Sequence, residues 1–198
     1  MRQSISIFWF RRDLRLNDNK GLLEALKQEV NVLPIFIFDT TILDSLAKDD
    51  ARVSFIYDTL QTMRRILEDK FNSGLALFYG NPLDIYEQLI GIYNIKAVHA
   101  NHDYEPYARK RDADIKILLE KHEIPFRTYK DQVIFEKNEI EKSDGTPYVV
   151  YTPYMKLWKQ TFKSQKLETF NTEEYFGNLV RNINVPNITL DAIGFKKS

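Results

Sequence analysis

Polar, charged and aromatic side chains gather at three places along the chain, and each place directly follows a strand-like run. These places are residues 11–19, 39–41 and 101–112. Together they offer guanidinium, carboxylate, amide and hydroxyl groups and tyrosine rings, which are the groups that bind and orient a polar small molecule. We therefore take these three clusters as the candidate binding residues of the chain.

Several common catalytic chemistries are missing from the sequence. The chain contains no cysteine, which removes disulfides, thiolate nucleophiles and Cys-type zinc sites. No Gly-x-Gly-x-x-Gly or Gly-Lys-Ser/Thr loop follows a strand-like run, and no serine stands in an elbow motif. We interpret His99 and His102 as ordinary imidazoles rather than metal ligands, because the chain has only three histidines. The sequence indicates a binding site and not a self-contained catalytic centre.

The composition predicts a globular protein with a core of its own. The 198 residues are 43% hydrophobic and carry 28 basic and 28 acidic side chains. A chain of this length buries enough surface to fold without disulfides, and the lack of cysteine fits a cytoplasmic location. The apolar runs at residues 7–10 and 33–38 are too short to span a bilayer, so we expect no signal peptide and no membrane partner. The net charge of zero argues against binding nucleic acid by charge alone.

Strand-like and helical patterns alternate along the first two thirds of the chain. Buried strands are predicted at residues 5–10, 32–38, 75–79, 97–100 and 125–129. Helices are predicted from a cap at Asn17 or Asp18 to Gln28, from Asp50 to residues 72–74, from Pro82, and from Pro106 to His122. This alternation predicts an α/β fold, a doubly wound, Rossmann-like five-stranded parallel sheet flanked by helices.

The last third of the chain has a different pattern. Residues 133–135 and 148–151 are short β-like pieces on either side of a turn at residues 143–145, and Thr152 is expected to cap a helix with Pro153 at its first position. Beyond Lys163 the sequence is polar and rich in Asn, which is typical of a linker that leads away from the domain. We expect an α/β core at residues 1–131, an extension of the same domain at 132–165 and a linker at 166–198.

The three polar clusters are expected to meet at one edge of the sheet. In an open parallel sheet, ligands bind outside the carboxyl ends of the strands, which is where all three clusters lie. Each cluster also has a purely structural interpretation. Residues 11–15 could form a self-paired charge cluster, Asp103 and Glu105 could cap the next helix, and residues 109–111 could be an ordinary exposed helix face.

Residues 8–19 read Phe-Trp-Phe-Arg-Arg-Asp-Leu-Arg-Leu-Asn-Asp-Asn. This run closely resembles the opening of the DNA photolyase and cryptochrome family, Trp-Phe-Arg-x-Asp-Leu-Arg-x-x-Asp-Asn. Further matches follow in order: Ala-Arg-Val at 51–53, Asp-Tyr-Glu-Pro-Tyr-Ala-Arg-Lys-Arg-Asp at 103–112, Tyr-Val-Val-Tyr-Thr-Pro-Tyr at 148–154 ahead of Trp158, and Ile-Gly-Phe at 193–195. The resemblance covers essentially the whole chain.

The resemblance implies one half of a two-part protein. The family's N-terminal α/β domain holds a light-absorbing antenna chromophore, and its C-terminal helical domain holds FAD, receives the excitation and injects an electron into a pyrimidine dimer. We therefore expect the antenna domain of a deoxyribodipyrimidine photolyase, or the same domain of a cryptochrome photoreceptor. Its partner is the FAD-binding helical domain, through which alone it would meet damaged DNA, and without that domain we expect no lyase activity.

Two other classes of protein share parts of this pattern. A nucleotide-binding module of the universal-stress or electron-transfer flavoprotein type has the same doubly wound layout. It predicts a Gly-rich phosphate loop after a late strand, which is not found. A pure interaction scaffold predicts an exposed apolar stripe, whereas each stripe here has a strand to cover.

The resemblance also bears on the chromophore. Family members that bind methenyltetrahydrofolate carry an acidic residue at the position of Ala108, and alanine cannot accept the same hydrogen bond. Members that bind a deazaflavin or a flavin carry a pattern like residues 103–109, so the resemblance favours these chromophores, although some relatives use none. The pocket residues it implies are Ile37, Arg52, Val53, Ser54, Asp103, Tyr104, Glu105, Pro106, Tyr107, Arg109 and Arg111.

Overall fold

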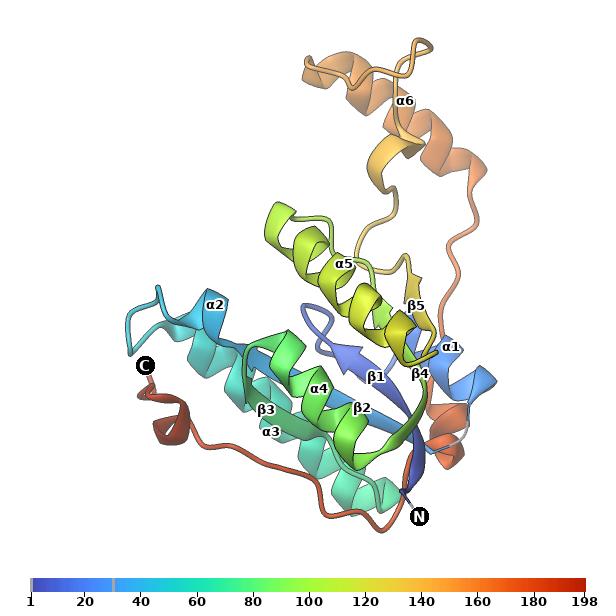
Figure 1. Ribbon diagram of the computed structural model, residues 1–198. Coiled ribbons are helices and arrows are strands. Elements are labelled where there is room, and N and C mark those ends of the chain that lie inside the picture. Colours follow the sequence, from blue (N-terminus) through green and yellow to red (C-terminus); the bar gives the residue numbers. More distant parts are fainter. Residues whose placement is uncertain (1, 30) are drawn as a thin grey trace.

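Five parallel strands form the centre of the protein, in the order β3-β2-β1-β4-β5. The computed structural model describes residues 2–29 and 31–198 (Figure 1). The strands are β1 (Ser4–Phe10), β2 (Val32–Asp39), β3 (Ala76–Gly80), β4 (Asn94–Asn101) and β5 (Phe126–Tyr129). Every residue of β2 is buried, which explains its unbroken apolar sequence. The predicted α/β fold with a five-stranded parallel sheet is confirmed.

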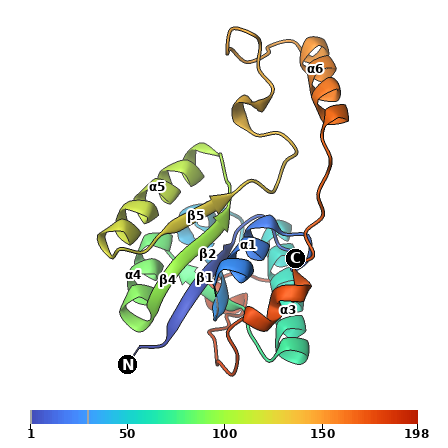
Figure 2. The ribbon, with the colours of Figure 1, turned by 90° about the vertical axis from the view of Figure 1, so that its right-hand side faces the viewer.

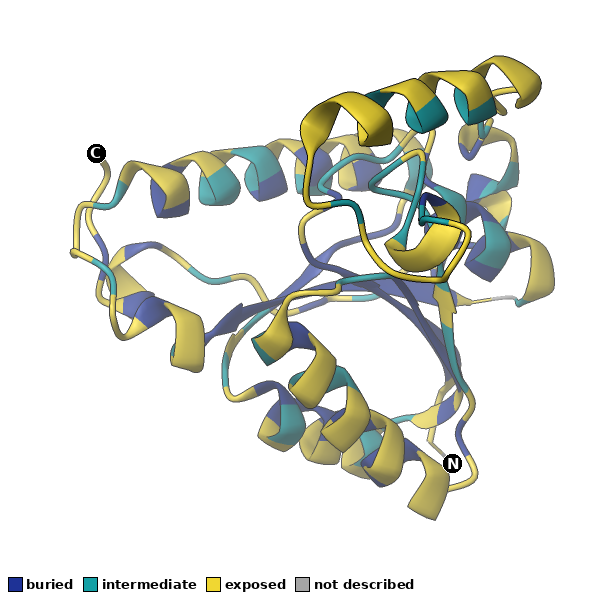
Figure 3. Cartoon of the chain, turned by 90° about the horizontal axis from the view of Figure 1, so that it is seen from above, coloured by how far each residue is buried: buried dark blue, intermediate teal, exposed yellow. Residues whose placement is uncertain are grey.

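Helices cover both faces of the sheet (Figure 3). Helices α1 (Lys20–Gln28) and α3 (Ala51–Phe71) pack on the face that presents Phe8 and Phe10. Helices α4 (Pro82–Ile92) and α5 (Pro106–Lys121) pack on the opposite face, which presents Trp9. Successive side chains of β1 thus lie in two separate cores, because side chains alternate between the two faces of a strand. None of the helices in residues 2–29 and 31–198 is both long and apolar enough to cross a membrane.

The helix ends follow the capping residues of the sequence, with one correction. Asp50 caps α3 by accepting from the Arg52 N–H, and the helix ends at Asn72 in the left-handed conformation. Helix α1 is capped by Asn19, however, and not by Asn17 or Asp18 as predicted. Asp18 has a φ of +52°, and its carboxylate accepts instead from the Phe170 N–H.

Residues 133–168, which we call the arm, stand away from the sheet and carry helix α6 (Tyr151–Ser164) (Figures 1 and 2). The prediction of β pieces at 133–135 and 148–151 is wrong, because the arm offers no neighbouring strand to pair with. The predicted Thr152 cap is also wrong: Val150 is the cap residue, and Thr152 lies inside the helix. The turn at 143–145 is confirmed, with Gly145 at a φ of +76°.

Residues 170–198, which we call the strap, return to the α/β core instead of leading away from it (Figure 1). The strap runs past α1, forms a bridge from Leu179 to Val32 and accepts at the Pro186 carbonyl from the Leu77 N–H. Its apolar residues are buried in the two cores: Phe176, Leu179, Val180, Val185, Leu190, Ile193 and Phe195. Their irregular spacing has neither a helical nor a strand period, which is why the sequence suggested a polar linker. The division of the chain at residues 131 and 165 stays a prediction.

Candidate functional site

A cavity of about 490 Å³ opens at the carboxyl ends of β1 and β2. Its walls come from these strand ends, from α2 (Thr40–Leu43) and the start of α3, and from the loop after β4 with the first turn of α5. The chain leaves β1 toward β2 on one side, and β4 lies on the other side. The cavity therefore lies beside the point where the strand order reverses, which is the usual ligand position in doubly wound sheets.

The structure brings most of the predicted pocket residues to this cavity and places the others elsewhere. The lining includes Ile37, Arg52, Val53, Asp103, Glu105, Tyr107 and Arg111. Ser54 lies outside the lining, where its hydroxyl accepts from the Ser198 N–H at 2.9 Å. Pro106 is the first residue of α5, and Tyr104 and Arg109 line a separate groove of about 310 Å³ between α5 and β5.

Sequence reasoning missed several lining residues. They are Trp9 and the apolar residues Phe36, Phe38, Ile42, Leu43, Leu46 and Ile56. Arg12, Asp39 and Ala108 also line the cavity; they lie in the three polar clusters of the sequence but were not among the predicted pocket residues. Val53 and Ile56 are three residues apart on α3, so helical spacing from Val53 could have identified the second. The contribution of α2 and the following loop carries no comparable signal, because it depends on how that loop folds over the strand ends.

The loop after β1 is held by a buried hydrogen-bond network. The Asn101 amide donates to Asp13 at 2.6 Å and to Asn19 at 2.8 Å, and its oxygen accepts from the Gly21 N–H at 2.9 Å. A Cβ atom at Gly21 would come within 2.3 Å of the Asn101 side chain, so only glycine fits there. Asp13 and Asn19 thus fix the loop that carries the arginines of the site.

The arginines of this loop form ion pairs with distant carboxylates and not with Asp13, so the interpretation of residues 11–15 as a self-paired cluster is wrong. One guanidinium nitrogen of Arg11 contacts both carboxylate oxygens of Asp112, at 2.6 and 2.7 Å. The other donates to the Asn101 carbonyl. Arg15 contacts Asp131 at 2.7 Å. Paired in this way, the arginines join the end of β1 to α5 and to the chain after β5.

Arg12 forms the outer lip of the cavity with the loop after β4. It lies 2.6 Å from Glu105 and 3.8 Å from Asp103, and the bond to Glu105 raises the pKa of the Arg12 guanidinium. Glu105 occupies the cap position of α5, but its side chain makes no capping bond. The capping interpretation of Glu105 is therefore wrong, and its carboxylate pairs with Arg12 at the lip of the cavity.

Tyr107 and Asp39 link the two sides of the cavity. The Tyr107 hydroxyl donates to Asp39 at 2.5 Å, and the other Asp39 oxygen accepts from the Thr41 N–H at 3.0 Å. Burial, together with the bond to Asp39, raises the pKa of the Tyr107 hydroxyl. Asp39 is only 6% exposed, so its carboxylate is a rare buried acceptor in a largely apolar wall.

Trp9 lines the cavity, and two guanidinium groups lie over its ring. The Arg111 and Arg11 guanidinium carbons are 4.7 and 5.0 Å from the centre of its ring, and Tyr86 packs edge-on at 5.4 Å. These contacts hold the indole in one orientation. The site thus combines apolar walls, one buried acceptor and a lip of paired charges. This arrangement suits binding a flat ring with polar edges better than bond-breaking chemistry.

Comparisons with known proteins identify one family that matches the chain. The DNA photolyase family model matches residues 6–173. The chain is 34% identical over 163 residues to a deoxyribodipyrimidine photolyase from Synechococcus sp. PCC 6301, and the match covers 82% of this chain and 34% of that protein. The chain therefore spans about a third of the length of this relative.

Two solved structures share the fold. A cryptochrome from Synechocystis sp. PCC6803 matches with a TM-score of 0.81 and 18% identity, over 100% of this chain and 41% of that protein. An archaeal photolyase from Sulfolobus tokodaii matches with a TM-score of 0.67 and 24% identity, over 93% of this chain and 44% of that protein. Its structure contains two FAD molecules and implicates a novel light-harvesting cofactor. Both matches show that the sheet and its helices are arranged as in longer proteins.

Proposed function

Because this chain belongs to the DNA photolyase family, we propose that it is the light-harvesting antenna domain of a deoxyribodipyrimidine photolyase and that its cavity binds the antenna chromophore. The observation that carries this proposal is the cavity of about 490 Å³ at the carboxyl ends of β1 and β2. Small-molecule sites typically have volumes of roughly 300–1,000 Å³. The chromophore, when bound, would supply the absorption of light and the transfer of excitation.

The lining fits a flavin or a deazaflavin. Ile37 and Val53 would hold the flat ring from β2 and from the first turn of α3, where both are buried apolar residues. Asp39 and the Tyr107 hydroxyl oxygen, whose proton is donated to Asp39, offer acceptors to N–H groups on the polar edge of such a ring. Arg52, which Asp50 holds at 2.6 Å, adds a positive charge at the cavity wall for the ribityl or phosphate end. These residues would orient the ring and exclude water from it.

Ala108 disfavours methenyltetrahydrofolate. It lies in the cavity lining, is 3% exposed and presents only a methyl group. The neighbouring carboxylates of Asp103 and Glu105 already face Arg12. A pterin that needs a free carboxylate at the position of Ala108 would find none, so we rank the flavin-type chromophores first.

The activity of the whole protein belongs to the same proposal. Excitation would pass from the antenna to FAD in a C-terminal helical domain, and that domain would bind damaged DNA and repair its pyrimidine dimers. The flavins of the Sulfolobus tokodaii photolyase and the name of the Synechococcus relative support this assignment. The match to a cryptochrome supports a second candidate, the same antenna domain in a light-signalling protein. Dimer repair by a longer polypeptide that contains this chain would separate the two candidates.

A binding titration tests the antenna proposal on the chain itself. We expect riboflavin phosphate or a deazaflavin to bind, with quenched or polarised fluorescence, and methenyltetrahydrofolate to bind at least tenfold more weakly. Ala108→Leu should abolish binding by filling the cavity, whereas Ala113→Leu, on the exposed side of the same helix, should leave it unchanged. Absence of binding by all these compounds, or equal binding by the Ala108→Leu variant, would refute the proposal.

A further inference from the structure

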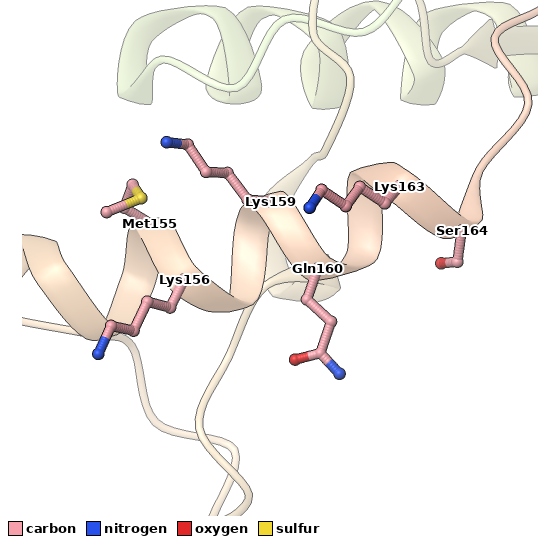
Figure 4. A pocket seen from close by; sticks show the side chains of 6 residues that line it. All are labelled: Met155, Lys156, Lys159, Gln160, Lys163 and Ser164. Atoms are coloured by element: carbon pink, nitrogen blue, oxygen red, sulfur yellow. The ribbon is translucent and has the colours of Figure 1, made fainter.

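The cavity is walled by several separate segments of the chain. The groove along α6, of about 500 Å³, is lined by residues of that helix alone, among them Met155 and Lys159 (Figure 4). The cavity takes its lining instead from strand ends, from α2 and the loop after it, and from the first turns of α3 and α5. Its shape therefore depends on how these segments are held against one another.

The wall formed by α2 and the loop at residues 44–50 has little support of its own. Helix α2 is only four residues long, and most side chains of the loop are exposed. Its backbone hydrogen bonds are local, as from the Leu46 N–H to the Leu43 carbonyl at 3.0 Å. Segments with so few buried contacts open easily. Because Leu43 and Leu46 both line the cavity, we expect another part of the chain to hold this wall in place.

The end of the strap packs behind this wall. We call residues 190–198 the strap end, which lies beside α2 in Figure 1. The Lys196 N–H donates to the Lys48 carbonyl at 2.7 Å, and the Lys48 ammonium lies 4.7 Å from the centre of the Phe195 ring. Phe195 is 1% exposed and belongs to the same hydrophobic core as Leu43. The strap end thus fixes the loop after α2 through its backbone and through a buried ring.

The strap end also contacts the start of α3. The Ser198 N–H donates at 2.9 Å to the hydroxyl of Ser54, which follows Val53 of the cavity lining. Ser54, which the family resemblance placed among the pocket residues, therefore lies behind the wall. Gly194, at a φ of +75°, forms the turn that brings the strap end back onto α3. One short stretch of chain thus holds two segments of the wall.

We propose that the strap end positions the wall of the cavity, so that chromophore binding and docking of the strap end stabilise each other, an inference that rests on the proposed function. Undocking would free the loop that carries Leu46 and the turn of α3 that carries Val53. A ligand that needs this wall must favour the docked strap end by the same factor by which docking favours the ligand. Gly194 and Phe195 are positioning residues, because neither is among the described residues that line the cavity.

Hydrogen exchange of the ligand-free chain tests the docking. Gly194→Ala and Gly145→Ala are a matched pair, since the two glycines have φ values of +75° and +76° and an added Cβ atom would meet nothing within 4 Å at either. Alanine resists this conformation, so Gly194→Ala should speed exchange of the Leu46 and Asp50 amides about fivefold or more. Gly145→Ala, in the arm, should leave both amides unchanged. Equal exchange of these amides in the two variants would overturn the proposal.

A titration with riboflavin phosphate tests the link to the cavity. Phe195→Ala should weaken binding about tenfold or more, because the loop after α2 loses its buried support. Leu179→Ala also removes a buried side chain of the strap, but Leu179 bridges Val32 at the end of β2 away from the cavity. This control should lower stability and change affinity by no more than about twofold. Equal affinities of the two variants would show a loss of stability alone and overturn the proposal.

Two further variants keep the titration decisive. Phe195→Leu retains a large apolar side chain and should restore most of the affinity that Phe195→Ala loses. If Phe195→Ala does not fold, Gly194→Ala takes its place and should bind riboflavin phosphate more weakly than Gly145→Ala. Equal binding by these two glycine variants would again overturn the proposal.

The two measurements separate this proposal from the antenna function. Exchange is measured without ligand, so it decides the role of the strap end even if no flavin binds. Flavin binding with unchanged exchange removes the strap end as a positioning element, and faster exchange without flavin binding removes only the chromophore. Saturating riboflavin phosphate should in turn slow exchange of the Lys196 amide, and an unchanged rate would refute the coupling.

Discussion

Protonation of His99 should destabilise this fold as the pH falls below about 6.5. His99 is fully buried in β4, with its Nδ1 atom 3.0 Å from the Tyr129 hydroxyl and its ring stacked on that of Tyr129. Burial, and after it the charge of nearby Arg127, lower the pKa of His99 to about 4 against the opposing effect of Glu29 and Glu24. The folded protein therefore holds this imidazole neutral.

The size of the effect follows from the difference between the folded and unfolded pKa values. His99 takes up a proton near pH 6.5 in the unfolded chain, but only near pH 4 in the folded chain. Stability conferred by the neutral imidazole is therefore present above about pH 6.5 and is lost progressively as the pH falls toward about 4. Between about pH 7.5 and about pH 5 the loss is about 2 kcal/mol.

Urea unfolding at several pH values, followed by tryptophan fluorescence, measures this loss. Other groups also titrate in this range, so the quantity to compare is the difference between the unmodified chain and His99→Gln. We expect the variant to lose about 2 kcal/mol less than the unmodified chain over this range, because it has no imidazole to protonate at this position. His122→Gln, which removes an exposed imidazole at the end of α5, is the control and should keep the original dependence. Parallel curves for His99→Gln and the unmodified chain would refute the reasoning.

Three further predictions concern the site and the strap. Glu105→Ala should weaken flavin binding about two- to five-fold, because it releases Arg12 from an exposed ion pair; unchanged affinity in a titration would contradict the role of the lip. Phe195→Ala should lower the free energy of unfolding by about 3–5 kcal/mol, since the ring is 1% exposed; a loss below about 1 kcal/mol in urea would show that the strap is not part of the core. The 198-residue chain with added FAD should show no light-driven repair of pyrimidine dimers. Repair in that assay would overturn the hypothesis that repair needs a separate FAD-binding helical domain.

The sheet and its order of helices could be read from local patterns because each pattern has a local cause. The apolar residues of β1 and β2 are buried on both faces, so the strands appear as unbroken runs. Pro82 at the first position of α4 and Asp50 before α3 mark helix starts through their own backbone and side-chain geometry. In the arm the same kind of reasoning failed: residues 133–135 have strand-like side chains but no partner strand.

The amino-acid sequence by itself determined the fold class, the family and the edge of the sheet at which the cavity lies. It could do so because strands, helices and the edge at which parallel strands end are all set by short-range spacing. Only the tertiary structure decided that Arg11 pairs with Asp112, that Tyr107 reaches Asp39 and that the strap returns to the core. These contacts join residues far apart in the chain, and their partners are chosen by the packing of whole elements, which no local pattern encodes.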